Sequence, residues 1–371
     1  MWRGQAGTRS GLSGDAGHET RDEAETSEPW RQRARQYSGA PWCARARRLG
    51  GSIPWRGLLM SADLNRREFV AALGAAAVAA GAPIHVPPPV SSTRLILLGT
   101  AGGPTPKRTR SGPAQVILAG DAAYVVDCGN GVARQLVLAG VPFQALRHVF
   151  ITHHHSDHNA DYGNLLLLFW ASGLAHRVDT WGPPPLARIT ELFLQTSAPD
   201  IDVRTVDEGQ PPLGQLIHPH DLPQAGLVME DGNVRVTSAL VQHPMVPIAY
   251  AYRFDAPDRS IVISGDTARS ASLAKLAAGA DVLVHEAFYP PAVDRMVAGH
   301  ANAEPLRRHL LASHTSAEDC GRVAAEAGVK TLVLSHFVPA EEPPVSDEMW
   351  AEAAGKHFKG RIIVGRDLME I

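Results

Sequence analysis

A short run of histidines and aspartates is the feature of this chain whose chemistry is easiest to define. His153, His155, Asp157 and His158 follow the spacing His-x-His-x-Asp-His, directly after the apolar run 149–151. Side chains two residues apart point the same way on an extended segment, so His153 and His155 can converge on one metal ion while Asp157 and His158 turn toward a second. Imidazole and carboxylate are common zinc ligands, and the run therefore predicts a metal site.

Three later positions supply the further ligands that a pair of ions needs. His243 follows the run 236–241, Asp266 stands in Ser-Gly-Asp-Thr, and His336 follows the run 332–335. Gly265 permits a sharp turn and a close approach of the Asp266 carboxylate. One shared carboxylate is what holds two ions together. His154, inside the first run, lies outside the spacing and is expected to be a neighbour rather than a ligand.

Alternating strands and helices are expected to position these residues. Apolar runs predict strands at 95–98, 114–118, 124–126, 149–152, 236–241, 260–264, 282–285 and 331–335, and a helix over 134–138. Several of the later runs end in a polar residue, which is typical of a sheet edge that carries an active site. The sequence therefore predicts an α/β fold with the site at one edge of a sheet.

The first 90 residues differ from the rest of the chain. Residues 1–59 hold ten Arg, no Lys and four of the seven Trp, without apolar periodicity, which predicts a disordered or non-native upstream extension. Met60 then opens a segment with Arg66-Arg67 and an apolar stretch over 70–82, the form of a twin-arginine export signal. We expect a signal peptide over 60–90, a hydrolase domain over 91–371, and a periplasmic or secreted protein without membrane attachment after cleavage. An uncleaved anchor or buried helix is the alternative for the apolar stretch, and a cytoplasmic location follows if the signal is unused.

Charge and cysteine content narrow the choice of class only slightly. The net charge of −3 gives no global basic field of the kind that drives nonspecific nucleic-acid binding, although it allows a local basic patch. Cys128 and Cys320 are the cysteines that follow the predicted signal, and their spacing indicates no disulfide framework.

These motifs together resemble the metallo-β-lactamase superfamily, in its ribonuclease Z and zinc arylsulfatase-like branch, over about 93–371. The segment 98–104 is similar to the first-strand turn of the branch, and 126–129 to its second motif. The segment 285–289 is similar to the His-Glu-Ala-Thr motif with Phe288 in place of Thr, and 314–316 resembles the His-Ser-Thr element. The resemblance implies a four-layer αββα sandwich with a dinuclear metal site at one sheet edge.

The resemblance also implies roles for the site residues. Asp157 would orient the attacking water, and Glu286 would keep His314 charged until it protonates the leaving oxygen. A helix-capping or buried hydrogen-bonding role is the alternative for His314. Two cations would lower the pKa of a bridging water toward neutrality. The implied ligands of two Zn²⁺, with Mn²⁺ as the alternative metal, are His153, His155 and His243 for one ion, Asp157, His158 and His336 for the other, and Asp266 as the bridge.

The substrate is predicted from two observations. The span 161–242 lacks the basic, glycine-rich arm of a tRNA-processing enzyme of this branch, and an export signal separates the protein from tRNA. Both predict an exported dinuclear zinc hydrolase of the arylsulfatase or phosphodiesterase type. It would cleave sulfate esters or phosphodiesters of small molecules, without a nucleic-acid partner and with a homodimer allowed.

Three alternatives remain open. They are a ribonuclease Z-type tRNA 3′-endonuclease, a lactonase, since hydroxide on two metals also attacks carbonyls, and a non-catalytic metal-binding protein. Residues that choose the substrate are expected within 165–170, 244–247 and 290–308.

Overall fold

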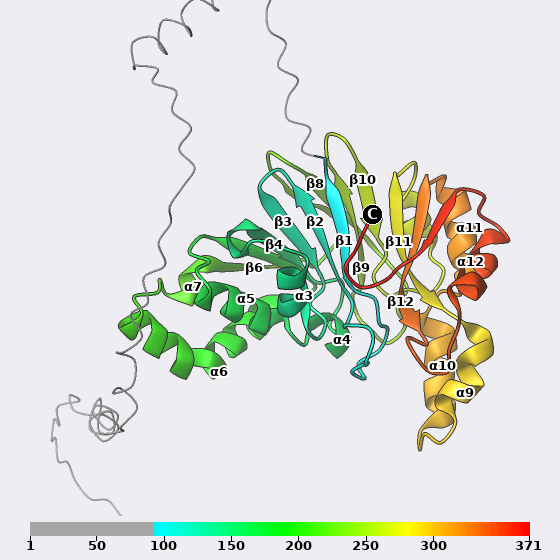
Figure 1. The fold of residues 1–371 in the computed structure, drawn as a ribbon, viewed down its shortest axis with the longest axis horizontal. Helices are drawn as coiled ribbons and strands as arrows, with labels where there is room; N and C mark the ends of the chain where they lie inside the picture. The colour runs from blue at the N-terminus through cyan, green and yellow to red at the C-terminus, as the bar shows by residue number, and fades with distance from the viewer. Residues whose placement is uncertain (1–91) are drawn as a thin grey trace, which may run out of the picture. The chain divides into compact units, whose positions relative to one another are not determined.

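The computed structural model describes residues 92–371, and these form a sandwich of two sheets (Figure 1). The predicted upstream extension, 1–59, and the predicted signal peptide, 60–90, lie outside the described residues. Among the described residues, no helix combines the length and the apolar character needed to cross a bilayer.

The two sheets have seven strands each and the same plan. Each sheet has an antiparallel half and a parallel half. The first sheet has the order β14 (Met369–Glu370), β1 (Arg94–Gly99), β2 (Ala114–Ala119), β3 (Ala122–Val126), β4 (Leu146–Phe150), β5 (Val178–Gly182) and β6 (Ile217–Asp221). The second has the order β13 (Arg361–Val364), β12 (Thr331–Val338), β11 (Val282–Phe288), β10 (Ser260–Ile263), β9 (Tyr250–Asp255), β8 (Arg235–Leu240) and β7 (Gly226–Glu230).

Helices cover the outer face of each sheet, as Figure 1 shows. The first sheet is covered by α3 (Val132–Leu138), α5 (Tyr162–Ala171), α6 (Leu186–Asp207) and α7 (Leu213–Leu216). The second is covered by α8 (Ala271–Leu276), α11 (Ala317–Ala327) and α12 (Asp347–Gly355). Three short or peripheral helices, α4 (Ser156–Asn159), α9 (Val293–Val297) and α10 (Ala303–Ser313), lie at one edge of the sandwich.

Strand alternation builds three apolar layers between these elements. In β1, Leu95 and Leu97 enter the core between the two sheets, while Ile96 and Leu98 enter the core between the first sheet and its helices. Because successive side chains of a strand point to opposite faces, a strand that is apolar at every position must be buried on both sides. A third core lies between the second sheet and α8, α11 and α12. The predicted four-layer αββα architecture is confirmed.

The expected strands are present with small shifts of their ends. The run expected at 149–152 is β4, which begins earlier and ends at Phe150, so that Ile151 and Thr152 lead out of the sheet. The parallel strands β10, β11 and β12 end at the same edge, and β4 ends there from the other sheet. That shared edge is where the predicted site residues meet.

Candidate metal centre

Three histidines from both sheets converge in a first cluster. His153 and His155 follow β4, and His243 follows β8. Nδ1 of His155 lies 3.2 Å from Nε2 of His153 and 3.1 Å from Nε2 of His243. Burial, followed by the neighbouring imidazoles, lowers the pKa of His153 and His155, and burial lowers the pKa of His243 to about 4. Neutral imidazoles with converging lone pairs are the form that binds a metal ion.

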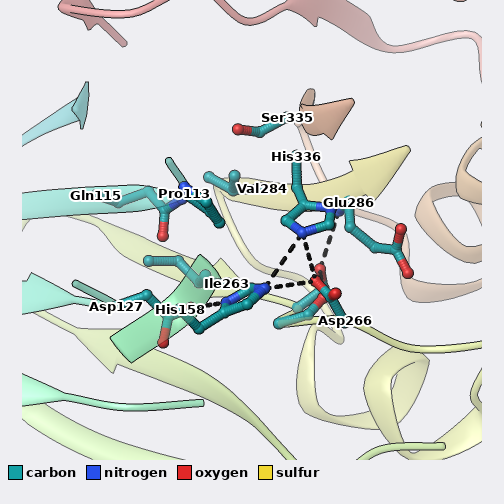
Figure 2. Close-up of a pocket in the computed structure, with 12 residues that line it drawn as sticks. Pro113, Gln115, Asp127, His158, Ile263, Asp266, Val284, Glu286, Ser335 and His336 are labelled. Carbon is teal, nitrogen blue, oxygen red and sulfur yellow. Dashed lines mark hydrogen bonds and ion pairs between the residues drawn. The ribbon is translucent and has the colours of Figure 1, made fainter. Parts of the chain in front are cut away.

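A second cluster lies beside the first and holds Asp157, His158 and His336. The Nε2 atoms of His158 and His336 are 3.2 Å apart. Oδ2 of Asp157 lies 3.6 Å from Nε2 of His158 and 3.4 Å from Nε2 of His336. All three side chains are buried. Figure 2 shows His158 and His336 turned toward each other and toward Asp266.

Asp266 stands between the clusters and presents one carboxylate oxygen to each. Its Oδ1 lies 3.3 Å from Nε2 of His158 and 3.2 Å from Nε2 of His336, while its Oδ2 lies 4.0 Å from Nε2 of His153. The predicted sharp turn is present, since Gly265 has a φ of 58°. An added Cβ at this glycine would lie 2.7 Å from the Tyr250 carbonyl oxygen, so only glycine brings the carboxylate this deep.

The donor set fits two cations. Oδ1 of Asp266 is buried and has no hydrogen-bond partner among the described residues, which is costly for a carboxylate oxygen unless a cation satisfies it. The ligand atoms of each cluster lie within 4.8 Å of one another, in the groups His153, His155, His243 and Asp157, His158, Asp266, His336. Imidazole nitrogens combined with carboxylate oxygens suit Zn²⁺ and Mn²⁺.

A β-bulge aims His336 into the site. Glu286 of β11 pairs with Ser335 of β12, but Ala287 pairs with Phe337, so His336 is the extra residue of its strand. Its φ of 45° is left-handed, as expected for a bulge that redirects a side chain. Gly102 leaves room for this ring, since a Cβ there would lie 2.8 Å from Nδ1 of His336.

Other residues hold the ligands in orientation. Nδ1 of His158 donates to Oδ2 of Asp127 at 2.8 Å, and Oδ1 of Asp127 accepts the backbone N–H of Thr152 at 2.8 Å. Nδ1 of His243 donates to the Ser313 carbonyl at 3.2 Å. Each bond leaves Nε2 free for a metal, which is the usual arrangement around ligating histidines.

The first-strand turn contributes as well, because the Gly103 N–H donates to Oδ2 of Asp157 at 3.0 Å. His154 turns away from the site and lies 2.7 Å from the Pro183 carbonyl oxygen through its Nε2.

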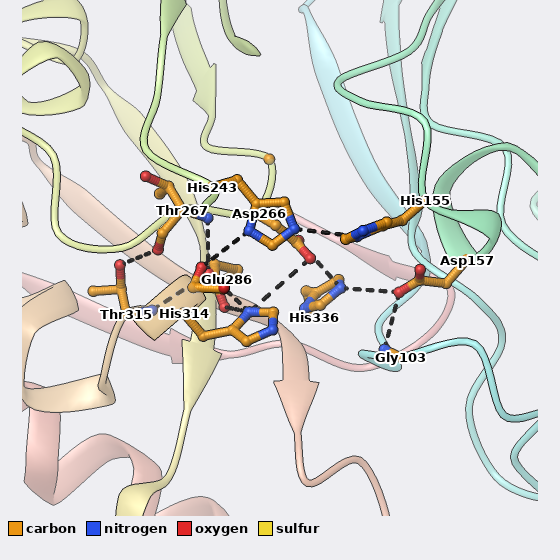
Figure 3. A network of polar contacts seen from close by, with 12 residues as sticks. Gly103, His155, Asp157, His243, Asp266, Thr267, Glu286, His314, Thr315 and His336 are labelled. Atoms are coloured by element: carbon orange, nitrogen blue, oxygen red, sulfur yellow. Dashed lines mark hydrogen bonds and ion pairs between the residues drawn. The ribbon is translucent and has the colours of Figure 1, made fainter. Parts of the chain in front are cut away.

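Glu286 and His314 form the predicted pair next to the clusters (Figure 3). Nδ1 of His314 lies 3.1 Å from Oε2 of Glu286, and the carboxylate also accepts the N–H groups of Thr267 and Thr315 at 2.9 and 3.3 Å. Burial by itself lowers the pKa of His314, but the adjacent Glu286 carboxylate outweighs burial and raises it to about 9. The same nitrogen lies 4.0 Å from Oδ2 of Asp266. A protonated imidazole at this position can supply a proton to a leaving oxygen.

A cavity of about 540 Å³ opens over both clusters. Residues of the turn after β1, of α9 and of α10 line it, together with His155, Asp157, Asp266, His314 and His336. Of the segments expected to choose the substrate, only 290–308 lines this cavity, through Met296, His300 and Leu306. The segment 165–170 belongs to α5, and most of its large apolar side chains are buried in the core between this helix and the first sheet. The segment 244–247 lies outside this cavity.

A second hollow of about 260 Å³ adjoins the cavity and shares the turn 103–105, Ser156 and Asp157 with it. Lys107, Arg110 and Arg134 line the hollow. Among residues 92–371, neither Lys107 nor Arg134 has a carboxylate within ion-pair distance. The guanidinium of Arg110 stacks on Phe337, with its central carbon 4.6 Å from the ring centre. The local basic patch that the sequence allowed is therefore next to the candidate metal centre.

Comparison with known proteins agrees with this geometry. The family model described as "Beta-lactamase superfamily domain" matches residues 123–337. The ribonuclease Z of Mycobacterium bovis (strain BCG / Pasteur 1173P2) is 34% identical over 280 residues, which are 75% of this chain and 97% of that relative. The ribonuclease Z of Mycobacterium sp. (strain KMS) is 32% identical over 277 residues, which are 74% of this chain and 94% of that relative.

Solved structures show the same fold. The short form of human tRNase Z superposes with a TM-score of 0.54 at 20% identity, over 75% of this chain and 98% of that chain. The metallo-β-lactamase fold protein YhfI from Bacillus subtilis superposes with the same TM-score, identity and coverage.

Two sheets in an αββα sandwich, with two His and Asp clusters joined by one aspartate at the sheet edge, define a metal-dependent hydrolase. The chain belongs to the metallo-β-lactamase superfamily, in its ribonuclease Z branch. The resemblance stated from the motifs is thereby confirmed.

Two predictions from the sequence are wrong. The exported hydrolase of small sulfate esters or phosphodiesters, and the expectation of no nucleic-acid partner, are contradicted by ribonuclease Z relatives that match three quarters of the chain. The physical reason for the wrong substrate is that a set of metal ligands does not determine the size of the ester that is bound. The basic side chains near the candidate metal centre, Lys107, Arg110 and Arg134, lie outside the span 161–242. The periplasmic or secreted location stays a prediction, since 60–90 lies outside the described residues.

Proposed function

We propose that the protein is a ribonuclease Z-type endonuclease that cuts precursor tRNA at its 3′ end with two Zn²⁺. The observation that carries the proposal is the 34% identity to a ribonuclease Z along 97% of that relative, combined with a complete dinuclear ligand set. His153, His155 and His243 would hold one ion, Asp157, His158 and His336 the other, and Asp266 both.

The residues of this chain have distinct tasks in such a reaction. Activation of water and polarisation of the phosphodiester are the chemistry that bound ions supply. Asp157, fixed by the Gly103 N–H, orients the attacking water. His314, kept protonated by Glu286, gives its proton to the oxygen that leaves phosphorus. The Glu286 carboxylate is buried, so bulk water does not compete with His314 for it.

The basic hollow supports an RNA substrate. Phosphate contacts from Lys and Arg dominate nucleic-acid affinity, and they fix the register of the strand on the protein. Lys107 lines both the hollow and the metal cavity, so a strand with one phosphate at the metal centre can place a neighbouring phosphate against it. Arg134, at the start of α3, extends the same positive surface outward.

The test is cleavage of a precursor tRNA by the zinc-loaded full chain, with Asp157→Ala as the matched control. We expect a cut at the discriminator base by the wild type and a loss of at least ~100-fold in the variant, the size typical for removal of a proton-transfer or water-orienting group. Elemental analysis should find two zinc ions per chain. A wild type that holds two ions but leaves precursor tRNA intact, while hydrolysing a homoserine lactone, would replace this proposal with the lactonase alternative.

The proposed function requires the protein and tRNA to be in the same compartment. It therefore requires the cytoplasmic alternative, in which the twin-arginine segment over 60–90 is not used for export. Fractionation of cells that express the full chain, with N-terminal sequencing of the product, measures this. A mature protein that begins near residue 91 and is found only outside the cytoplasm would contradict the proposal.

A further inference from the structure

The α10 helix forms a wall of the metal cavity, although its sequence gave no ligand pattern. Leu306, His309 and Leu310 line the cavity, and their spacing places them on one helical face. Leu310 is buried against Phe288 and Val338 in a small apolar cluster of its own. The wall is therefore packed in place and presents a single polar side chain, His309, from α10.

His309 lies among the site histidines without belonging to either ligand group. Its ring centre is 6.2 Å from that of His155, 6.0 Å from that of His243 and 5.9 Å from that of His314. None of the metal-binding groups found among the described residues includes it. Its imidazole is half-buried and open to the cavity, so it can reach a substrate held over the metal clusters.

Ser313 fixes the orientation of this ring. Its Oγ lies 3.2 Å from Nδ1 of His309, while its carbonyl accepts the N–H of the metal-cluster residue His243. In the tautomer in which this hydroxyl donates to Nδ1, the proton of the neutral ring is on Nε2, and Nε2 is then the donor that the ring offers in the cavity. Ser313 thus orients the imidazole ring of His243 as well as that of His309.

We propose that His309 is a substrate-binding residue whose Nε2–H donates to a non-bridging phosphate oxygen of the RNA strand beside the scissile bond. This inference rests on the proposed ribonuclease function. Lys107 also lines the cavity, so His309 gives the strand a second polar contact from a different element. The two contacts would hold the phosphate-bearing backbone in the cavity that opens over the ligand clusters.

The variants His309→Leu and His309→Gln test the role in the zinc-loaded full chain. Leucine removes the donor, and we expect the KM for precursor tRNA to rise about tenfold with kcat changed less than threefold, as loss of one hydrogen bond of ordinary strength predicts. The glutamine amide can reach the position of Nε2, so His309→Gln should return KM to within about threefold of wild type. Leu311→Gln, on the same helix but outside the cavity lining, is the matched control and should behave as wild type.

Two further measurements separate binding from damage. Zinc content should stay at two ions in both variants, because His309 is not in the ligand groups. Fluorescence anisotropy with labelled precursor tRNA, in the non-cleaving Asp157→Ala background, should show about tenfold weaker binding for His309→Leu.

If wild type cleaves precursor tRNA and His309→Leu matches it in KM and affinity, this inference falls and the proposed function stands. If His309→Gln is as defective as His309→Leu, the hydrogen-bond role is also overturned. If wild type does not cleave precursor tRNA, the proposed function and this inference fall together.

Discussion

Three of the clustered histidines have one ring nitrogen held by the protein and the other free. Nδ1 of His158 bonds Asp127, Nδ1 of His243 bonds the Ser313 carbonyl, and Nδ1 of His153 lies 3.1 Å from the Thr152 hydroxyl. A ring fixed in this way loses no further rotational freedom when it binds an ion. We therefore expect the residues around the candidate ligands to contribute to metal affinity without touching the metal.

Asp127→Asn tests this contribution. The substitution removes the carboxylate that orients His158 but nearly preserves side-chain volume. We expect zinc affinity to fall roughly 10- to 100-fold, the usual effect of losing such a partner. Competition with a chromogenic chelator measures it, and Asp179→Asn, remote from both clusters, is the control. An unchanged zinc affinity would show that the orientation of His158 does not depend on the Asp127 carboxylate.

Glu286→Gln tests the proton donor. The carboxylate raises the pKa of His314, so its removal should lower that pKa and move the basic limb of the kcat profile to lower pH. The rate on precursor tRNA should fall about 100-fold or more, since general acid catalysis contributes at least that much. Zinc content should be unchanged, and Glu352→Gln on the exposed side of α12 should have no effect. A basic limb that does not move would exclude His314 as the proton donor.

At the scale of elements, a turn and a bulge aim the ligands, and each depends on a close backbone approach. Gly265 brings Asp266 to within reach of both clusters, and the bulge of β12, whose extra residue is His336, turns this imidazole inward. Both belong to the second sheet: the turn follows the end of β10, and the bulge interrupts the pairing of β12 with β11.

Gly265→Ala tests the turn. Alanine at a φ of 58° carries about 1–2 kcal/mol of left-handed strain, and its Cβ would also meet the Tyr250 carbonyl oxygen at 2.7 Å. We expect the variant to lose zinc and activity together. Gly279→Ala is the matched control, since Gly279 has a φ of 66° but open space around its Cβ. It should lose stability only, in denaturant unfolding, and equal zinc loss in both variants would contradict the close-approach argument.

The same scale shows what the sequence could predict. The runs that became β1, β10, β11 and β12 are continuously apolar because both faces are covered, and such runs stand out in a sequence. The helix α6 does not stand out, since it contains Pro199 and buries only Leu186 and Thr190. Its helical state comes from packing on the first sheet, which no local pattern reveals.

In the candidate site, too, some residues could be predicted from the sequence and others could not. The ligand set could be predicted because metal ligands need a few residue types at fixed spacing, and His153 to His158 show both. His309 was missed because its role depends on the face that α10 turns to the cavity. The signal that could have found it is the apolar spacing of Leu306 and Leu310, which places His309 on the inward side.

At the scale of the whole molecule, each candidate ion would join the two sheets. His153 and His155 leave the first sheet while His243 leaves the second, and Asp157 and His158 leave the first while Asp266 and His336 leave the second. Without cations, the edge of the sandwich holds a buried carboxylate oxygen that no hydrogen bond satisfies. The metal content should therefore control the stability of the entire sandwich, and not only the activity of the site.

Removal of metal tests this link. At a free zinc concentration a thousandfold above Kd, each site stabilises the folded state by roughly 4 kcal/mol, which for a domain of this size corresponds to a rise in Tm of about 10 °C or more. Scanning calorimetry of the full chain, with zinc and after chelation, measures the difference. In a variant with both His243→Ala and His336→Ala, zinc should shift Tm by only a few degrees, because each site has lost a ligand from the second sheet. A wild-type Tm that is the same with zinc and with chelator would mean that the sheets are held together by their apolar core alone, and that the ligands from the two sheets do not share ions.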